Sequence, residues 1–366
     1  KLGSYREKAD RVASLAEWIA RDAFQKPDAA APAALAGRLA KADLATDMVR
    51  EFTELQGTMG GIYAREEGQP EAVWKAIYYH YLPVGVEADA PPSRQQLGPS
   101  TSLGASPSTS LGASAAVTWA AVSLADKLDS VAGMFAAGER PTGSRDPLGL
   151  RRQAQGAVKI LADLVELTGV TARIELWDLV TRALSSWAPS EDVPQTLRTF
   201  MRERVIYLFE QRGFDVRNVR AVVPQSLERF DMVEARKKLE ALAQMSGSEA
   251  LRGVATLFKR VKNITKGVSG GLATGPNDLL KERAEMALLQ SLKEVEPRIR
   301  DSAEKADYKQ AFHHIELLRA PVASFFDDVL VMAEDEKLRA ARLALVARLR
   351  DLILDIADIS EIAPET

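Results

Sequence analysis

Two aspartates, Asp126 and Asp129, carry the clearest potential for chemistry in this sequence. They are three residues apart in a segment with helical patterning, so their side chains share one side of the helix, as a metal site or an acid–base pair requires. The alternative is structural, with Asp126 accepting hydrogen bonds from backbone or arginine donors inside a helical core. We favour the structural role, and the pair remains a candidate site.

Imidazole and thiol groups are scarce. The chain has three histidines, His80, His313 and His314, and no cysteine. Neighbouring residues of a helix point about 100° apart, so His313 and His314 cannot easily hold one ion together. We predict solvated or core-edge positions for all three histidines. The lack of cysteine excludes disulfides, thiolate metal sites and cysteine nucleophiles, and it fits the cytoplasmic location that we expect.

Residues 57–61, Gly-Thr-Met-Gly-Gly, form a glycine-rich stretch that could in principle hold a phosphate. No Gly-x-x-x-x-Gly-Lys-Ser/Thr motif occurs, and the stretch follows a helix-like segment instead of the strand that a phosphate loop needs. We therefore predict a helix end that requires glycine. Arg151 and Arg152 follow a predicted helix start at Asp146-Pro147, and they are candidate contacts for a phosphate or for the two acids.

Two runs of basic residues contrast with the formal net charge of −3, which comes from 48 Lys and Arg against 51 Asp and Glu. The first run, within residues 251–271, has no acidic residue and offers contacts to nucleic-acid phosphates; the alternative is a solvated helix face. The second follows a group of acids, an order that also suits the helix dipole. The candidate residues are Arg252, Lys259, Arg260, Lys262, Asn263 and Lys266 in the first run, and Lys337, Arg339, Arg342, Arg348 and Arg350 in the second.

Helical elements must position these groups, because apolar residues recur at helical spacing almost throughout the chain, for example in one stripe from Val117 to Phe135. With 366 residues, 46% hydrophobic and 27% charged, the chain is long enough for two or three domains and an extensive core. We predict an all-α fold. The least charged stretch, residues 113–137, carries Asp126, Lys127 and Asp129 at its centre, so we predict no membrane span. The first residues lack an initiator Met, and we interpret the chain as a fragment of a longer protein.

Breaks in the helical pattern suggest where the elements end. Residues 89–114 are rich in Pro, Ser and Gly, and within them residues 99–106 are repeated as residues 107–114, so we predict a mobile low-complexity loop. Further breaks are expected at residues 139–147, 187–190, 221–224 and 266–277.

Five blocks of sequence resemble the beta subunit of the bacterial heterotetrameric glycyl-tRNA synthetase. The blocks occur in the order found in the family and span nearly the whole chain. Members of the family are longer, so the resemblance is to their carboxy-terminal half. The blocks are residues 43–60 (DLATDMVREFTELQGTMG), 125–129 (ADKLD), 141–152 (PTGSRDPLGLRR), 259–264 (KRVKNI) and 325–332 (FFDDVLVM).

The resemblance implies a domain order and a division of labour. Residues 1–160 would form a degenerate helical domain related to His-Asp phosphohydrolases, residues 161–222 a helical linker, and residues 223–366 an anticodon-binding bundle like that of arginyl-tRNA synthetases. The alpha subunit, with ATP and Mg, would form glycyl-adenylate, while the beta subunit grips glycine tRNA. The chain would thus be part of glycine-tRNA ligase, inactive alone, without a cofactor, and with no DNA or membrane as partner.

The sequence departs from the phosphohydrolase pattern at residues 41–43, where Lys-Ala-Asp stands near the expected His-Asp dyad. Alanine cannot ligate a metal and lysine would repel one, so we expect this domain to hold no metal and to catalyse nothing. Two alternatives remain, a helical scaffold for the alpha subunit and a metal-dependent phosphohydrolase, which we disfavour. The candidate tRNA contacts are then Arg252, Lys259, Arg260, Lys262, Asn263, Lys266, Arg339 and Arg342, with Arg151 and Arg152 as further phosphate contacts.

Overall fold

The computed structural model describes residues 2–98, 109–143, 145–146, 149–245, 247–268 and 277–363, with the backbone alone for residues 109–114. These residues are helical apart from turns and two isolated β-bridges, Thr142 with Arg145 and Glu175 with Asp231. The predicted all-α fold is confirmed for them. None of the helices described is both long and apolar enough to cross a membrane.

The chain divides into two compact units. Unit 1 comprises Lys1–Gly213 with Gln225–Val233, and unit 2 comprises Phe214–Pro224 with Glu234–Thr366. This division differs from the predicted boundaries at 160 and 222. Residues 164–211 form no separate linker, because their helices pack against the same central helix as the preceding ones.

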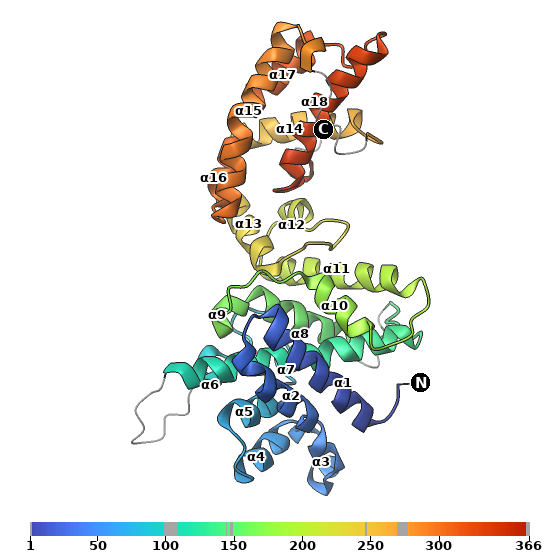
Figure 1. Ribbon diagram of the computed structural model, residues 1–366, viewed down its shortest axis with the longest axis vertical. Coiled ribbons are helices and arrows are strands. Elements are labelled where there is room, and N and C mark those ends of the chain that lie inside the picture. Colours follow the sequence, from blue (N-terminus) through green and yellow to red (C-terminus); the bar gives the residue numbers. More distant parts are fainter. Residues whose placement is uncertain are drawn as a thin grey trace. The chain divides into compact units, whose positions relative to one another are not determined.

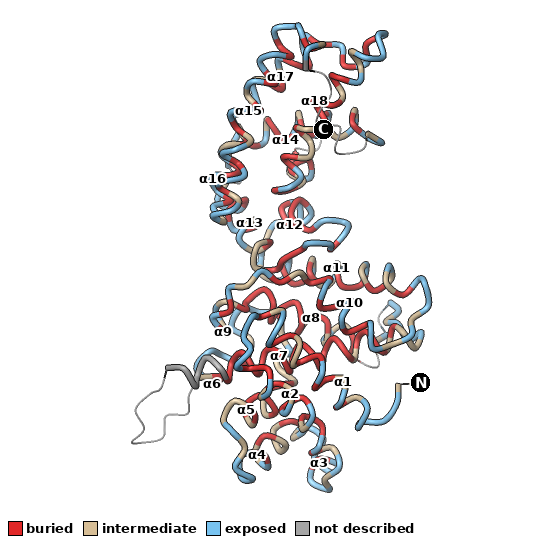
Figure 2. The backbone as a smooth tube through the Cα atoms, in the orientation of Figure 1, coloured by how far each residue is buried: buried red, intermediate tan, exposed pale blue. Residues whose placement is uncertain are grey.

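Unit 1 is built around one long helix, α7, which is buried along most of its length (Figure 1, Figure 2). Helices α1, α2, α5, α8, α10 and α11 all pack against it. Its predicted apolar stripe, from Val117 to Phe135, lies in the core. The helices of the unit are α1 (Tyr5–Trp18), α2 (Ala30–Leu39), α3 (Asp47–Glu51), α4 (Thr58–Glu66), α5 (Glu71–Tyr79), α6 (Arg94–Leu97), α7 (Thr109–Ala136), α8 (Leu150–Ala162), α9 (Leu164–Thr168), α10 (Leu176–Leu184) and α11 (Val193–Gln211).

The predicted loop over residues 89–114 is shorter in the structure. Residues 94–97 form α6, which Ser93 caps by accepting the Gln96 N–H, and α7 already begins at Thr109, inside the second copy of the repeat. Leu97 is fully buried, which ties α6 to the core. The remaining residues of the predicted loop, 99–108, lie outside the described residues.

Helix α8 begins three residues later than the Asp146-Pro147 pattern predicts. Gly149, with φ +65°, stands at the N-cap, and the helix starts at Leu150. Asp146 still provides acceptors for the free N–H groups of the first turn, because its carboxylate accepts hydrogen bonds from the N–H groups of Leu150 and Arg151 at 2.8 and 2.9 Å. The predicted N-cap at Asp146 is therefore wrong in position, although the Asp146 carboxylate still bonds to the first N–H groups of the helix.

Unit 2 is a bundle in which α14 packs against α16, α17 and α18. Leu251, Val254, Phe258 and Val261, at spacings of three and four, form the buried side of α14. Lys262 on this helix pairs with Asp358 near the carboxyl end. The helices are α12 (Val216–Val222), α13 (Met232–Gln244), α14 (Glu249–Ile264), α15 (Arg283–Glu304), α16 (Tyr308–Glu316), α17 (Arg319–Asp328) and α18 (Glu336–Leu354).

Candidate functional site

The candidate acids Asp126 and Asp129 of α7 are buried and paired with cations from α1 and from the turn after α2. Asp126 Oδ2 accepts from Lys41 Nζ at 2.8 Å, and its Oδ1 lies 3.1 Å from Lys8 Nζ. Asp129 accepts from Arg11 Nε at 2.7 Å and from Lys8 at 3.2 Å. The structural role predicted for Asp126 is confirmed, although its donors are lysines and not arginines.

Lys41 lies between an imidazole and a carboxylate, where a metal ion would find its ligands. Its Nζ is 2.8 Å from His80 Nε2 as well as from Asp126, and it lies 3.9 Å above the Tyr81 ring. An ammonium group can only donate, so His80 Nε2 must accept, and Nδ1–H donates to the Ile77 carbonyl at 2.6 Å. The nitrogen that could bind a metal is thus occupied by a lysine.

The electrostatics of this buried group agree with that geometry. Burial, together with the Lys41 ammonium, lowers the pKa of His80 from 6.5 to about 3, so the ring is neutral. Burial by itself would raise the pKa of Asp126, but Lys41 and Lys8 outweigh it and hold that pKa well below the usual value. Neither group is left as a general base near neutral pH. His80 is a core residue and not a core-edge one.

Backbone N–H groups of the glycine-rich stretch at residues 57–61 are bonded to a side chain of the same unit. Gly57, with φ +79°, stands at the start of α4 and not at a helix end as predicted. The Asp43 carboxylate accepts the N–H groups of Gly57 and Gly60 at 2.6 and 3.0 Å. A helix N-terminus attracts anions, and here the anion is a side chain of the chain itself. A phosphate would have to displace Asp43.

No metal site forms in the part of the chain that the structure describes, since no three His, Asp or Glu side chains converge there. The two histidines His313 and His314 lie on α16, where His313 Nδ1 is 2.9 Å from Glu316. In unit 1, therefore, an internal cation and an internal anion fill the positions that a metal and a phosphate would need.

The outer face of α14 in unit 2 has the opposite character. Lys259, Asn263 and Lys266 are exposed, and among the described residues the side chains of these three make no hydrogen bond or ion pair. Arg252 is exposed on the same side, because positions 252, 259 and 263 fall within a narrow arc of the helix. Arg260 is exposed too, and its guanidinium packs 4.4 Å from the Phe326 ring. Four cations and an amide thus face solvent together.

Comparison with known proteins identifies the family. The family model described as glycyl-tRNA synthetase beta subunit matches residues 1–224, and the model described as DALR anticodon binding domain matches residues 255–364, which include most of α14. The chain belongs to the glycyl-tRNA synthetase beta subunit family. The predicted resemblance and the predicted anticodon-binding region at the carboxyl end are thereby confirmed.

Individual family members align along the chain. It is 38% identical over 367 residues to the glycine–tRNA ligase beta subunit of Anaeromyxobacter dehalogenans (strain 2CP-C), covering 100% of this chain and 48% of that protein. The corresponding subunit of Aromatoleum aromaticum is 38% identical with 99% and 48% covered, and that of Shewanella sp. (strain MR-4) is 37% identical with 98% and 48% covered. The chain spans about half the length of the curated relatives it matches.

Within this beta-subunit chain, the second basic run is largely engaged internally. Arg342 is 4% exposed and bonds to Glu285, which is 0% exposed, and to Glu282. A side chain held in the core cannot reach RNA, so the prediction of a tRNA contact at Arg342 is wrong. The other arginines of α18 are partly buried and bonded as well: Arg339 to the Ala333 carbonyl and Glu336, Arg348 to Glu296, and Arg350 to Asp351 and two carbonyls.

Three further candidates have defined surroundings. Lys262 of α14 is half-buried and donates to Asp358 and Ser360, so its charge is already compensated. Arg151 donates to the carbonyls of Gly143 and Arg145. Arg152 is exposed and lines a pocket of unit 1. The structure does not bring either arginine to Asp126 or Asp129.

Lys8 and Arg11, which hold the two acids of α7, were not among the residues predicted from the sequence. A signal existed, because Lys8 and Arg11 have the same spacing of three as Asp126 and Asp129. Arg319 of α17 was not predicted either, and its guanidinium lies so close to α14 that a Cβ at residue 253 would come within 2.5 Å of its Nε. A glycine inside α14 was a hint that another element approaches closely.

Proposed function

We propose that this chain is the tRNA-binding, non-catalytic part of a glycine-tRNA ligase beta subunit. The observation that carries the proposal is the outward face of α14, where Arg252, Lys259 and Asn263, with Lys266 just beyond the helix end, lie within or beside the region matched by the anticodon-binding model. Cations such as Lys259 and Lys266 gain most from neutralising phosphates, because no described residue already compensates their charge.

The division of the face suggests how tRNA would be held. Lys259 and Lys266 would contact phosphates, while Asn263 between them can donate to and accept from a sugar or a base edge. Anticodon bases are unpaired and can be splayed out of the loop, so side chains can reach their edges. The two cytosines expected in the anticodon of a glycine tRNA carry amino groups that require carboxylate or carbonyl acceptors. Phosphate contacts thus position the tRNA, and acceptors elsewhere on unit 2 would read it.

We further propose that unit 1 derives from a His-Asp phosphohydrolase-like domain and catalyses nothing. The support is the double internal occupation, with Lys41 between His80 and Asp126 and with Asp43 on the N-terminus of α4. Because the neutral imidazole and the ionised carboxylate are both bonded to the same ammonium, neither can bind a metal unless Lys41 leaves. This argues against the metal-dependent phosphohydrolase.

The alpha subunit would then supply glycine activation with ATP and Mg, and this chain would contribute the grip on tRNA. A scaffold that only supports the alpha subunit is the second candidate function. The exposed α14 face favours tRNA binding over that alternative, because a scaffold gives no reason for exposed cations such as Lys259 and Lys266 that no described residue compensates.

A binding titration distinguishes the two functions. We expect the full chain to bind glycine tRNA more tightly than a non-cognate tRNA of the same length, with a logarithm of affinity that falls linearly with the logarithm of salt concentration. Pyrophosphate exchange with glycine and ATP should stay at background. Equal affinity for both tRNAs would mean that the chain contacts tRNA without specificity. If no tRNA binds at low salt, the scaffold function would be the one supported.

A further inference from the structure

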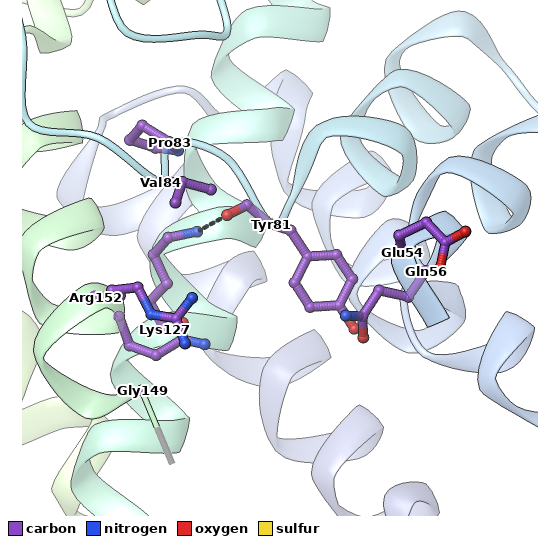
Figure 3. Close-up of a pocket in the computed structure, with 9 residues that line it drawn as sticks. Glu54, Gln56, Tyr81, Pro83, Val84, Lys127, Gly149 and Arg152 are labelled. Atoms are coloured by element: carbon purple, nitrogen blue, oxygen red, sulfur yellow. Dashed lines mark hydrogen bonds between the residues drawn. The ribbon is translucent and has the colours of Figure 1, made fainter. Parts of the chain in front are cut away.

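A pocket of about 400 Å³ opens in unit 1, between the turn at Thr53–Leu55, the segment after α5 and the first turn of α8 (Figure 3). Pockets of 300 to 1,000 Å³ are the usual size for small-molecule sites. The Tyr81 ring stands between Arg152 with Lys127 on one side and Glu54 with Gln56 on the other. The two ends of the pocket therefore differ in charge.

The end at α8 offers one available cation. Arg152 is exposed and makes no hydrogen bond or ion pair with the residues that the structure describes, and its guanidinium lies against Gly149. Gln153 stands next to it in the lining. Lys127 is different, because its Nζ already donates to the carbonyls of His80, Tyr81 and Leu82 and to Ser123 Oγ. Arg152 alone can form the two parallel bonds that a phosphate accepts.

The opposite end offers acceptors and an amide. Glu54 and Gln56 are exposed, and neither side chain is bonded within the described part of the chain. Burial raises the pKa of Tyr81 above its ordinary value, so its hydroxyl stays protonated. Val84, 55% exposed, and Pro83 beside it add apolar lining near Lys127. A carboxylate beside an amide suits a planar group that carries an exocyclic amino donor and a ring acceptor.

We infer that this pocket binds a single nucleotide unit, with its phosphate on Arg152 and the amino-bearing edge of its base on Glu54 and Gln56. The charges set the direction, because a phosphate placed at Glu54 would be repelled. Cytosine and adenine carry the amino group in question, whereas uracil presents a carbonyl there. The unit can be a free nucleotide or an unpaired nucleotide of a nucleic-acid strand. The inference is independent of the tRNA proposal, which concerns α14 in unit 2.

The test is a calorimetric titration of the full chain with CMP, AMP and UMP, and with a cytidine trinucleotide. CMP and AMP should bind more tightly than UMP. Arg152→Met should weaken CMP binding about tenfold or more, since it removes a charge-assisted pair of hydrogen bonds. Glu54→Gln should reduce the preference for CMP over UMP. Arg6→Met is the matched control, because Arg6 is an exposed arginine of α1, and it should change nothing.

The two sources are separated by the trinucleotide. If it binds much more tightly than CMP and loses affinity in Arg152→Met, the ligand is an unpaired strand; if it binds no better than CMP, the ligand is a free nucleotide. Either result supports the pocket. The inference is overturned if neither CMP nor the trinucleotide binds at millimolar concentration, or if CMP binds to Arg152→Met as tightly as to wild type. Thermal melting of each variant confirms folding, and tRNA binding measured alongside shows whether α14 is affected.

Discussion

Helices α14 and α18 of unit 2 both carry runs of basic residues, yet the runs have opposite environments. On the α14 side, Lys259 and Lys266 face solvent without partners among the described residues. On α18, Arg342 is buried against Glu285, and Arg348 bonds to Glu296 through Nε and Nη2 at 3.0 and 2.7 Å. The same residue types thus serve two purposes.

The difference lies in what each helix faces. Helix α18 packs against α15, which brings Glu282, Glu285 and Glu296 to its arginines. The buried side of α14 is apolar, so Lys259, on the opposite side of the helix, points to solvent, whereas Lys262 at the edge of that face pairs with Asp358. A basic run therefore indicates a nucleic-acid surface only if the helix that packs against it carries no matching acids.

Unit 1 shows the same contrast between a buried cation and an exposed one. Lys41 is buried and held by His80 and Asp126, whereas Arg152 is exposed and unbonded within the described residues. We expect buried, paired cations to stabilise the fold and to bind no ligand. We expect exposed, unpaired cations to contribute little to stability and to be available for ligands. The following predictions test that rule.

The largest effect is expected for Arg342→Met. Removing this guanidinium leaves Glu285 as a buried charge without its partner, which typically costs about 3–5 kcal/mol, so we expect a loss of that size in the free energy of unfolding. Urea denaturation measures it, with Lys259→Met as the matched control, expected within about 0.5 kcal/mol. A loss below about 1 kcal/mol for Arg342→Met would contradict the expectation that the buried arginine of α18 stabilises the fold.

The second effect is a pH dependence at His80. The pKa of His80 is about 3 in the folded chain against 6.5 for an ordinary histidine, so the unfolded state takes up the proton first as the pH falls. Stability present above pH 6.5 is then lost towards pH 3, by up to about 1.4 kcal/mol per pH unit. Burial is the main cause of the lowered pKa of His80; Lys41 and Lys127 lower it further, while Asp126 and the hydrogen bond to the Ile77 carbonyl oppose the shift.

The measurement compares wild type with His80→Gln by urea denaturation at about pH 7 and pH 5. Between these values wild type should lose about 2 kcal/mol more than the variant. His313→Gln, on the exposed side of α16, should lose as much as wild type. If wild type and His80→Gln respond alike, His80 is not held neutral by burial and Lys41.

A smaller effect is expected for Arg348→Ala, whose pair with Glu296 is only partly buried. Such a pair contributes about 1 kcal/mol or less, so the free energy of unfolding should fall by about that amount. The salt dependence of tRNA binding should not change, because the charge of Arg348 is already compensated. A flatter salt dependence in this variant would mean that compensated arginines also contact RNA.

The smallest effect on stability, and the largest on tRNA, is expected for the double variant Lys259→Ala, Lys266→Ala. Unfolding should stay within about 0.5 kcal/mol of wild type. The slope of log affinity against log salt should decrease by roughly one for each phosphate that the variant no longer neutralises. Lys262→Ala is the comparison on the same helix, since Lys262 is paired with Asp358. Unchanged slope in the double variant would show α14 to be a solvated face.

Much of the local structure followed from the sequence. The stripe from Val117 to Phe135 predicted the buried helix α7, and the break at residues 187–190 correctly separated α10 from α11. The spacing of Asp126 and Asp129 predicted a shared side of one helix. It could not predict their partners, because Arg11 lies 118 residues away from Asp129 along the chain.

The sequence by itself determined the helices, the apolar faces and the family, because helical periodicity and capping depend on residues a few positions apart. Only the tertiary structure decided which charges remain available. Lys41 and Lys259 are both lysines, yet Lys41 is buried between an imidazole and a carboxylate, whereas Lys259 is exposed to solvent. A cation finds its partner through packing between distant segments, and burial then strengthens the pair because little water remains to screen it.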